Sequence, residues 1–434
     1  MATEVSVLDK YGETTYYSNY ADARRDIINS EIEHPLVQIW ADLDEQIILL
    51  DEADIWIAPG VTISNSSGDT ITDNNVAVKC NISGYGNLTQ TSTGFYAVCN
   101  FTNSNSKVSV KCDIIENESA GQACVSSSAK KFHLECNLVY GKSHGAVFLN
   151  NNNSNDLNIN AEKILTGQIG EPSTGTTAII SRGNGFMHIN EILCRNLGHC
   201  FSHRAGEIIA DIRKMTTINN RTGNISTVHQ NQGTNDQVLV LYFDEIQCIT
   251  GSSNSLSAIE LKQGTGIFIG RRLYSDDTVT VIIGKDTPNS DPPQSISIRC
   301  NEIICSNEVA LTINDSVHQN YILANRIETS YFVVIYSNGG GNFVLKNPTV
   351  RNTSSSTDAI GIGVDTNQTL IELNNVKIVA GNSTSGRPIF VGNSTQMNVF
   401  NYGLFSNAPL NPSLTLLKIG TDSNFLFIQS EDLT

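Results

Sequence analysis

Hydrophobic and polar residues alternate in a short phrase that recurs along most of this chain. Its form is an apolar residue, any residue, an apolar or small residue, then Asn, Asp or Glu, any residue and an apolar residue. Clear copies are 110–115 VKCDII, 134–139 LECNLV, 159–164 INAEKI, 187–192 MHINEI, 241–246 LYFDEI, 298–303 IRCNEI, 322–327 ILANRI and 371–376 IELNNV. Weaker copies start at Val78, Ile208, Ile267, Val344 and Val399. The intervals average about 27 residues, which indicates a stacked repeat, because one such unit cannot bury its apolar face alone.

A second apolar burst follows most copies of the phrase. The bursts are 97–99 AVC, 123–125 ACV, 146–149 AVFL, 178–180 AII, 258–261 AIEL, 309–313 VALTI, 332–336 FVVIY and 359–364 AIGIGV. Clusters of Gly, Asn, Ser and Thr separate them, as in 352–357 NTSSST. Two or three short strands per turn, joined by polar bends, are typical of a parallel β-helix.

The third and fourth positions of the phrase predict two columns of stacked side chains. The third is small or apolar and is expected to face inward: Cys80, Cys112, Cys136, Ala161, Ile189, Ala210, Phe243, Ile269, Cys300, Ala324 and Leu373. The fourth is mostly Asn or Asp: Asn81, Asp113, Asn137, Glu162, Asn190, Asp211, Asp244, Asn301, Asn325, Asn347 and Asn374. Because Asn and Asp tolerate the left-handed conformation, this second column predicts a sharp corner at the end of each strand.

In turn length, asparagine column and stacked core, residues 36 to 430 resemble the right-handed parallel β-helix of the pectate-lyase-like superfold. Polysaccharide lyases and hydrolases share this fold with tailspike and fibre proteins of bacteriophages. The resemblance implies an all-β solenoid, and it leaves the function to be argued from a site.

The N-terminal segment predicts a cap for the open end of the solenoid. Asn19 can cap a short helix in which Tyr20, Ala23, Ile27 and Ile28 share one face. The expected organisation is an N-terminal cap with the helix over 1–35, first β-coils over 36–77, β-helix repeats over 78–405 and closing strands over 406–434.

Composition and charge argue against some classes of binding partner. The formal net charge is −16, from 27 Lys and Arg against 43 Asp and Glu, which argues against nucleic-acid and anionic-membrane surfaces. Ten cysteines are present. Cys80, Cys112, Cys136 and Cys300 fall in one inward column and Cys194, Cys248 and Cys305 in a second, so buried free thiols are expected rather than disulfides. Met1 to Lys10 lacks the features of a secretory signal, which predicts synthesis and use without export.

Few residues offer catalytic or binding chemistry. The segment with Arg271, Arg272, Tyr274, Asp276 and Asp277 is the first candidate. Its arginines and tyrosine could bind a sugar and its two aspartates could act as acid and base, whereas a solvated loop with local ion pairs is the plain alternative. A second cluster, Cys194, His199, Cys200 and His203, fits no common zinc spacing, and a turn between two rungs is the preferred interpretation, so no metal or cofactor is expected.

Other motifs lack essential partners. Ser143 and His144 have no identifiable third group of a triad, and Gly339, Gly340 and Gly341 lack the lysine of a phosphate loop. Polygalacturonase-like enzymes carry an Asn-Thr-Asp stretch, a double Asp, a Gly-His-Gly and an Arg-Ile-Lys on successive turns. This chain has the double Asp, Asp276 and Asp277, but neither of the last two motifs in position. No calcium-binding carboxylate cluster of a pectate lyase can be assigned either.

These features predict a virion structural or host-recognition protein, such as a bacteriophage tailspike, fibre or surface appendage. Expected partners are further copies of the chain, with a trimer favoured, other virion proteins and a host surface glycan. The alternative is a polysaccharide lyase or glycoside hydrolase of the same fold. A cell-surface adhesin is a third class, disfavoured by the missing export and anchoring signals.

Overall fold

The computed structural model describes a chain built almost entirely of β-strands. The described residues are 4–92, 94–118, 122–142, 145–150, 156–168, 177–195, 198–219, 225–230, 237–250, 256–276, 279–284, 295–314, 320–331, 333–338, 343–354, 360–364, 370–380, 387–391, 396–400, 403–406, 417–418 and 424–428. Their contacts divide into a first unit, Met1–Phe201 with Ala205–Ile212, and a second unit, Ser202–Arg204 with Arg213–Thr434. Strands β19 (Phe201–Ala205) and β20 (Glu207–Asn219) contribute residues to both units.

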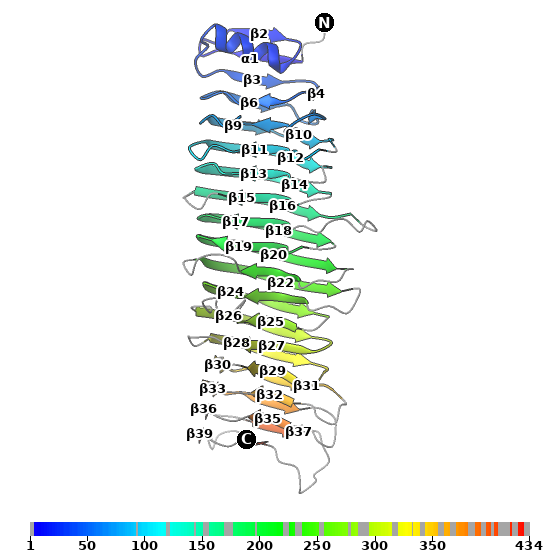
Figure 1. Cartoon of the computed structure of the whole chain (residues 1–434), viewed down its shortest axis with the longest axis vertical. Coiled ribbons are helices and arrows are strands. Elements are labelled where there is room, and N and C mark those ends of the chain that lie inside the picture. The colour runs from blue at the N-terminus through cyan, green and yellow to red at the C-terminus, as the bar shows by residue number, and fades with distance from the viewer. Residues whose placement is uncertain are drawn as a thin grey trace. The chain divides into compact units, whose positions relative to one another are not determined.

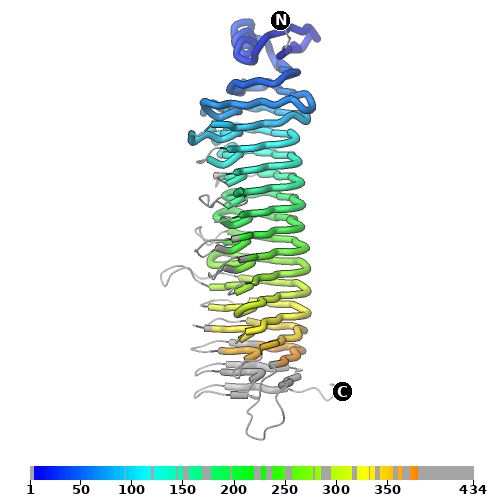
Figure 2. The backbone as a smooth tube through the Cα atoms, turned by 90° about the vertical axis from the view of Figure 1, so that its right-hand side faces the viewer, coloured from blue at the N-terminus to red at the C-terminus, as the bar shows by residue number. Residues whose placement is uncertain are grey.

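The first unit is a parallel β-solenoid with two sheets. Its long strands are β12 (Lys107–Asn117), β14 (Lys131–Gly141), β16 (Asp156–Thr166) and β18 (Gly185–Arg195), each parallel to the next. The second sheet contains β5 (Ile47–Ile48), β8 (Ile71–Thr72), β11 (Cys99–Phe101), β13 (Val125–Ser127), β15 (Val147–Asn150) and β17 (Ile179–Arg182). Figures 1 and 2 show the strands of this unit following one another turn by turn. The phrase and the second apolar burst thus predicted the two kinds of strand, and the parallel solenoid is confirmed.

Register explains why the phrase repeats. Val110 lies opposite Leu134, which lies opposite Ile159, and all three are fully buried. Two residues further on, Cys112, Cys136 and Ala161 form the next inward column. Because side chains alternate between the two faces of a strand, a one-residue slip would expose this whole set.

The predicted corner is a bend inside a continuous strand. In β12 both Asp113 and Ile114 are partly exposed, so the inward-outward alternation is interrupted there, yet the strand runs on to Asn117. Of the described residues in the fourth column, only Asn347 has positive φ, at 62°. The left-handed corner is therefore wrong for most of the column, because the strand continues through these positions without a positive φ.

The second unit repeats this plan. Its long strands are β22 (Val238–Thr250), β24 (Thr265–Ser275), β26 (Ser295–Cys305) and β28 (Asn320–Thr329), again in parallel register. Its second sheet contains β21 (Ile225–Gln230), β23 (Leu256–Leu261), β25 (Val279–Ile283), β27 (Val309–Asn314), β29 (Val333–Asn338), β32 (Ile360–Val364), β35 (Arg387–Val391) and β38 (Leu417–Lys418).

After β28 the long strand is divided in two. β28 pairs with both β30 (Phe343–Lys346) and β31 (Thr349–Asn352), and Asn347 lies in the gap. The following pieces are β33 (Leu370–Asn374), β34 (Lys377–Ala380), β36 (Gln396–Phe400), β37 (Gly403–Ser406) and β39 (Asn424–Ile428). Asn375, with φ 54°, occupies the same place after β33. Here the left-handed asparagine corner does occur.

Several copies of the phrase, among them the clear copy at Ile371, were placed out of register. Ile82, not Val78, lies opposite Val110, so Cys80 is buried but pairs with Val108. In the second unit Leu345 replaces Val344 opposite Ile322, and Leu373 replaces Ile371 opposite Leu345.

The copy at Ile267 is wrong by one residue. Phe268 is fully buried and lies opposite Leu241, which puts Gly270 rather than Ile269 opposite Phe243. A Cβ at Gly270 would lie 2.3 Å from the carbonyl oxygen of Phe243 and 2.4 Å from its ring. The bulky Phe243 therefore requires a glycine at the third position of the next turn, which an apolar pattern does not reveal.

The N-terminal cap combines a helix with antiparallel strands. α1 (Tyr20–Asn29) is capped by Asn19, whose side chain accepts from the Asp22 N–H, and it buries Tyr20, Ala23 and Ile27. Ile28 was predicted on this face but is 49 % exposed. The Tyr20 hydroxyl donates to the Ile48 carbonyl at 2.7 Å, which fixes the helix against the first coil.

The free edge of the first parallel strand is covered by a hairpin that the sequence did not predict. β1 (Val5–Leu8) pairs antiparallel with β2 (Thr14–Tyr17) and with β3 (Leu36–Ile39). Such cover removes an edge that could pair with another chain. The remaining strands before β12 are β4 (Leu43–Asp44), β6 (Asp54–Ile57), β7 (Thr62–Asn65), β9 (Lys79–Gly84) and β10 (Asn87–Gln90).

All ten cysteines are buried and free, as predicted. Cys112 and Cys136 are neighbours on β12 and β14 with their sulfur atoms 3.8 Å apart. Burial raises the pKa of the Cys194 thiol to about 11 and that of Cys300 to about 12, so both are protonated near neutral pH. These side chains act as small apolar residues.

Candidate functional site

The residues singled out from the sequence lie on a strand rather than in a loop. Arg271, Arg272 and Tyr274 belong to β24, and Asp276 follows its last residue. Asp277 lies outside the described residues, as do Ser143, His144 and Gly339, Gly340 and Gly341. Arg271 is exposed next to the bend, whereas Arg272 is partly buried. The loop expected for this segment is therefore a strand as far as Ser275, and the roles assigned to these residues stay predictions.

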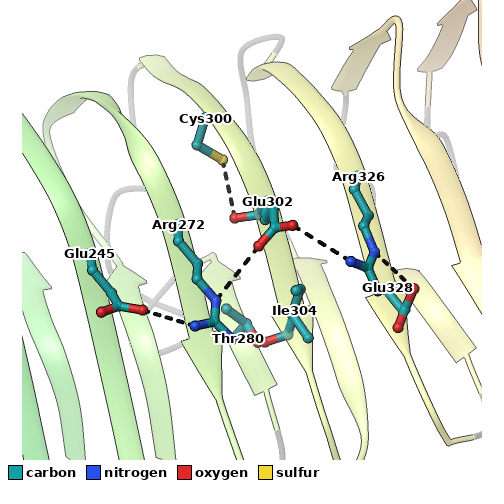
Figure 3. Close-up of polar contacts among 8 residues, drawn as sticks. All are labelled: Glu245, Arg272, Thr280, Cys300, Glu302, Ile304, Arg326 and Glu328. Carbon is teal, nitrogen blue, oxygen red and sulfur yellow. Dashed lines mark hydrogen bonds and ion pairs between the residues drawn. The ribbon is translucent and has the colours of Figure 1, made fainter.

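Arg272 is the centre of a ladder of alternating charges, which we call the Glu–Arg ladder: Glu245, Arg272, Glu302, Arg326 and Glu328 (Figure 3). Glu245, Arg272, Glu302 and Arg326 lie opposite one another on consecutive long strands. Arg272 Nη1 donates to Glu245 Oε1 at 2.9 Å, and its Nε lies 3.7 Å from Glu302 Oε2.

Arg326 completes the ladder on the next strand. Its Nη1 lies 3.5 Å from Glu302 Oε1, and its Nη2 donates to Glu328 Oε2 at 2.7 Å. The hydrogen bond with Glu328 is the largest of the effects that raise the pKa of the Arg326 guanidinium. Each guanidinium thus stands between two carboxylates, an arrangement that stabilises the stacking of turns.

Tyr274 is also engaged locally. The Arg272 guanidinium lies 4.9 Å from the centre of its ring, and its hydroxyl lies 3.3 Å from the Ser306 hydroxyl. This cation–π contact and the Glu–Arg ladder hold the positive charge of Arg272 close to the sheet. The ion pairs of Arg272 therefore run to Glu245 and Glu302 on neighbouring strands rather than to residues of its own segment.

A buried polar cluster on β21 and β23 was missed by sequence reasoning. The Glu260 carboxylate accepts from the Ser226 hydroxyl at 2.7 Å and lies 2.9 Å from Lys262 Nζ and 3.6 Å from His229 Nε2. Ser257 donates to Ser226 at 2.8 Å. Burial alone would raise the pKa of Glu260, but the charges of His229 and Lys262 and the Ser226 hydroxyl hold it below its usual value. Because these residues lie on different turns, no short sequence motif predicts the cluster.

A second missed feature is a hollow of about 310 Å³ on the outer face of the first unit. It is lined by Lys79, Asn81, Lys107, Val108, Ser109, Lys131, Phe132, His133, Asp156 and Asn158, and we call it the lysine hollow. Lys79 lies opposite Lys107, which lies opposite Lys131, so three positive side chains stack on consecutive strands. The signal was available, because the lysines recur at the repeat interval.

The predicted cysteine and histidine cluster shows local contacts of its own. Cys194 lies on β18. Its sulfur accepts from the Thr166 hydroxyl at 3.1 Å and contacts the Gly198 carbonyl oxygen at 3.2 Å. Cys200 is fully buried, and His203 lies on β19. Across the described part of the chain, no three His, Cys, Asp or Glu side chains are grouped so that they could hold a metal ion.

No family model matches the chain, and no curated protein or solved structure is significantly similar to it. Within the described residues, no helix has the length and apolar character needed to cross a membrane. The functional argument therefore rests on the solenoid and on its two charged surfaces.

Proposed function

We propose that this chain is a virion structural and host-recognition protein, a tailspike, fibre or surface appendage of a bacteriophage, that binds rather than cleaves. The observation that carries the proposal is the contrast between the Glu–Arg ladder and the lysine hollow. In the Glu–Arg ladder, arginine and carboxylates neutralise one another in register. In the lysine hollow, three positive side chains stack around a recess, and among the described residues Lys79 and Lys107 form no ion pair.

The resemblance of the repeat to the β-helix of phage tailspikes and fibres supports the virion assignment. A parallel solenoid presents the same outward positions on every turn, which suits binding to an extended polymer. On this proposal the protein is made in the host cytoplasm and acts in the virion, where it contacts other virion proteins and a host surface glycan. No metal or other cofactor is required for binding of this kind.

The alternative is a polysaccharide lyase or glycoside hydrolase with Asp276 and Asp277 as its acids. The deciding assay incubates the full-length protein with acidic and neutral bacterial polysaccharides and follows new reducing ends and unsaturated products. We expect binding without product. Turnover that is abolished by Asp276→Asn or Asp277→Asn would overturn the non-catalytic proposal, and turnover insensitive to both would do so with the acids elsewhere.

The virion role also predicts self-association. We expect a homotrimer, as is usual for viral fibres of this kind, and sedimentation equilibrium of the full-length protein measures it directly. A species that remains monomeric at all concentrations would contradict the proposed assembly.

A further inference from the structure

We propose that the lysine hollow is a binding site for a carboxylated sugar residue of an extended glycan. The proposal rests on the recognition role proposed above and adds the chemical class of the ligand and the residues that bind it. The site lies on strands β9, β12, β14 and β16 of the first unit.

The first argument is charge. Lys79, Lys107 and Lys131 are exposed and occupy the same register position on three consecutive strands, which lie about 4.8 Å apart. Lys131 pairs with Asp156 at 2.6 Å, whereas among the described residues neither Lys79 nor Lys107 forms an ion pair. Like charges at this spacing repel one another, and a bound anion would relieve that repulsion.

Among the described residues, the carboxylates next to the lysine hollow form no ion pair with Lys79 or Lys107. Asp54 accepts from the Asn81 side-chain amide at 2.9 Å, and Asp51 accepts from the Lys79 backbone N–H at 2.8 Å. Asp156 is held by Lys131. Two ammonium groups, those of Lys79 and Lys107, therefore remain for a ligand on a chain whose formal net charge is −16.

The second argument is shape and hydrogen bonding. Two residues further along each of the four strands, Asn81, Ser109, His133 and Asn158 form a parallel column of polar side chains. Ser109 is the shortest of them and lies between Asn81 and His133, which leaves the recess. A sugar ring can thus place its carboxylate against Lys79 and Lys107 and its hydroxyl groups against the Asn, Ser and His side chains.

The third argument is continuity along the same sheet. A neighbouring hollow of about 190 Å³ is lined in part by Tyr85, Lys111, Glu135 and Asn160. Tyr85 is 56 % exposed, and Lys111 Nζ lies 5.7 Å from the centre of its ring. An exposed aromatic ring beside a polar recess offers a stacking surface for a second sugar, so the two hollows suit a chain of sugars better than a single small ion.

The test measures binding to the full-length protein by isothermal titration calorimetry. The probes are uronic-acid monosaccharides, oligogalacturonate and oligoglucuronate, the same oligosaccharides with their carboxyl groups reduced to alcohols, inorganic phosphate and a single-stranded oligonucleotide. We expect an acidic oligosaccharide to bind, with an affinity that falls as salt is added. Carboxyl reduction and the double variant Lys79→Gln/Lys107→Gln should each weaken binding at least tenfold.

Lys214→Gln/Lys346→Gln is the matched control, because both lysines are exposed on the second unit, form no ion pair among the described residues and together lose the same two charges. It should bind like the unaltered protein, and all variants should keep its melting temperature. Equal binding by the double variant would overturn the site, and equal binding of the reduced sugar, or tighter binding of phosphate or oligonucleotide, would overturn the ligand class. Absence of binding by every uronic acid at millimolar concentration would overturn both.

Failure of the recognition role itself is measured separately. The recognition role would be contradicted if the protein neither adsorbed to host cells nor blocked adsorption of the virion. If blocking persists while uronic acids do not bind, the recognition role stands and the acidic-sugar proposal falls.

Discussion

Two columns of charged side chains, one on the outer face of each unit, differ in how the charges on opposite strands are paired. In the second unit Glu245, Arg272, Glu302 and Arg326 alternate in sign across consecutive strands, so every neighbour is attractive. In the first unit Lys79, Lys107 and Lys131 repeat one sign, so the neighbours repel. An alternating column stabilises the solenoid, whereas a like-charged column contributes nothing to folding. The Glu–Arg ladder therefore stabilises the structure, whereas the lysine column suits a ligand.

The largest expected effect tests the inward column beneath the outer face of the first unit. Cys136→Arg places an unpaired charge in a column where the native side chain is 4 % exposed, and we expect it to destabilise the protein by about 4 kcal/mol or more. Asn137→Arg, one residue along and exposed, is the control and should change stability little. Chemical denaturation measures both, and similar stability of the two variants would contradict the inward column.

The next effect compares the two faces directly. Arg272→Met leaves Glu245, whose side chain is 16 % exposed, without its hydrogen-bond donor, and we expect a loss of about 1–3 kcal/mol. Lys107→Met removes one member of a repelling column and should change stability by less than about 0.5 kcal/mol, if anything upward. Thermal unfolding measures the stability of the two variants. An equal loss in both would contradict the distinction between the stabilising Glu–Arg ladder and the lysine column.

Acid should destabilise the second unit through Glu260. Because the pKa of Glu260 in the folded chain is lowered from 4.5, its charged form stabilises the fold above about pH 4.5, and that contribution is lost as the pH falls through the folded pKa. Glu260→Gln should therefore flatten the decrease in stability below pH 4.5. Chemical denaturation at a series of pH values measures this decrease, and an unchanged profile in Glu260→Gln would exclude the role of Glu260.

The sequence predicted the solenoid because the spacing of the repeat determines which residues of successive strands lie opposite one another. Val110, Leu134 and Ile159 share one environment, and apolar periodicity detects a shared environment directly. It failed where a glycine holds an inward position: Gly270 faces Phe243, and no count of apolar residues would find it. The same limit displaced the copy at Val78, since the inward position after Ile82 is Gly84.

The candidate sites were harder to predict because they depend on neighbours across turns. From the sequence, Arg272 is interpreted as a cation in a loop. In the structure, β22 and β26 place Glu245 and Glu302 on either side of it. Lys79, Lys107 and Lys131 each stand three residues before the apolar residue that starts their turn, at Ile82, Val110 and Leu134. Aligning the turns by this corrected register would have revealed the lysine column. The hollow beside it depends on side-chain lengths in the next column, which the repeat does not encode.

The smallest expected effect concerns the column that the sequence interpreted as corners. The Asn137 side-chain amide donates to Asp113 Oδ1 at 2.8 Å on the outer face of the first unit, between turns that the core already fixes. Because the bond is exposed, Asn137→Ala should cost only about 0.5–1 kcal/mol. Asn325→Ala is the matched variant in the second unit, where the amide lies 3.4 Å from Asn301 Oδ1 and the acceptor is uncharged, so its loss should be smaller still. Chemical denaturation of both variants measures the order. A loss of several kcal/mol at Asn137 would show that this column stabilises the bend of each turn.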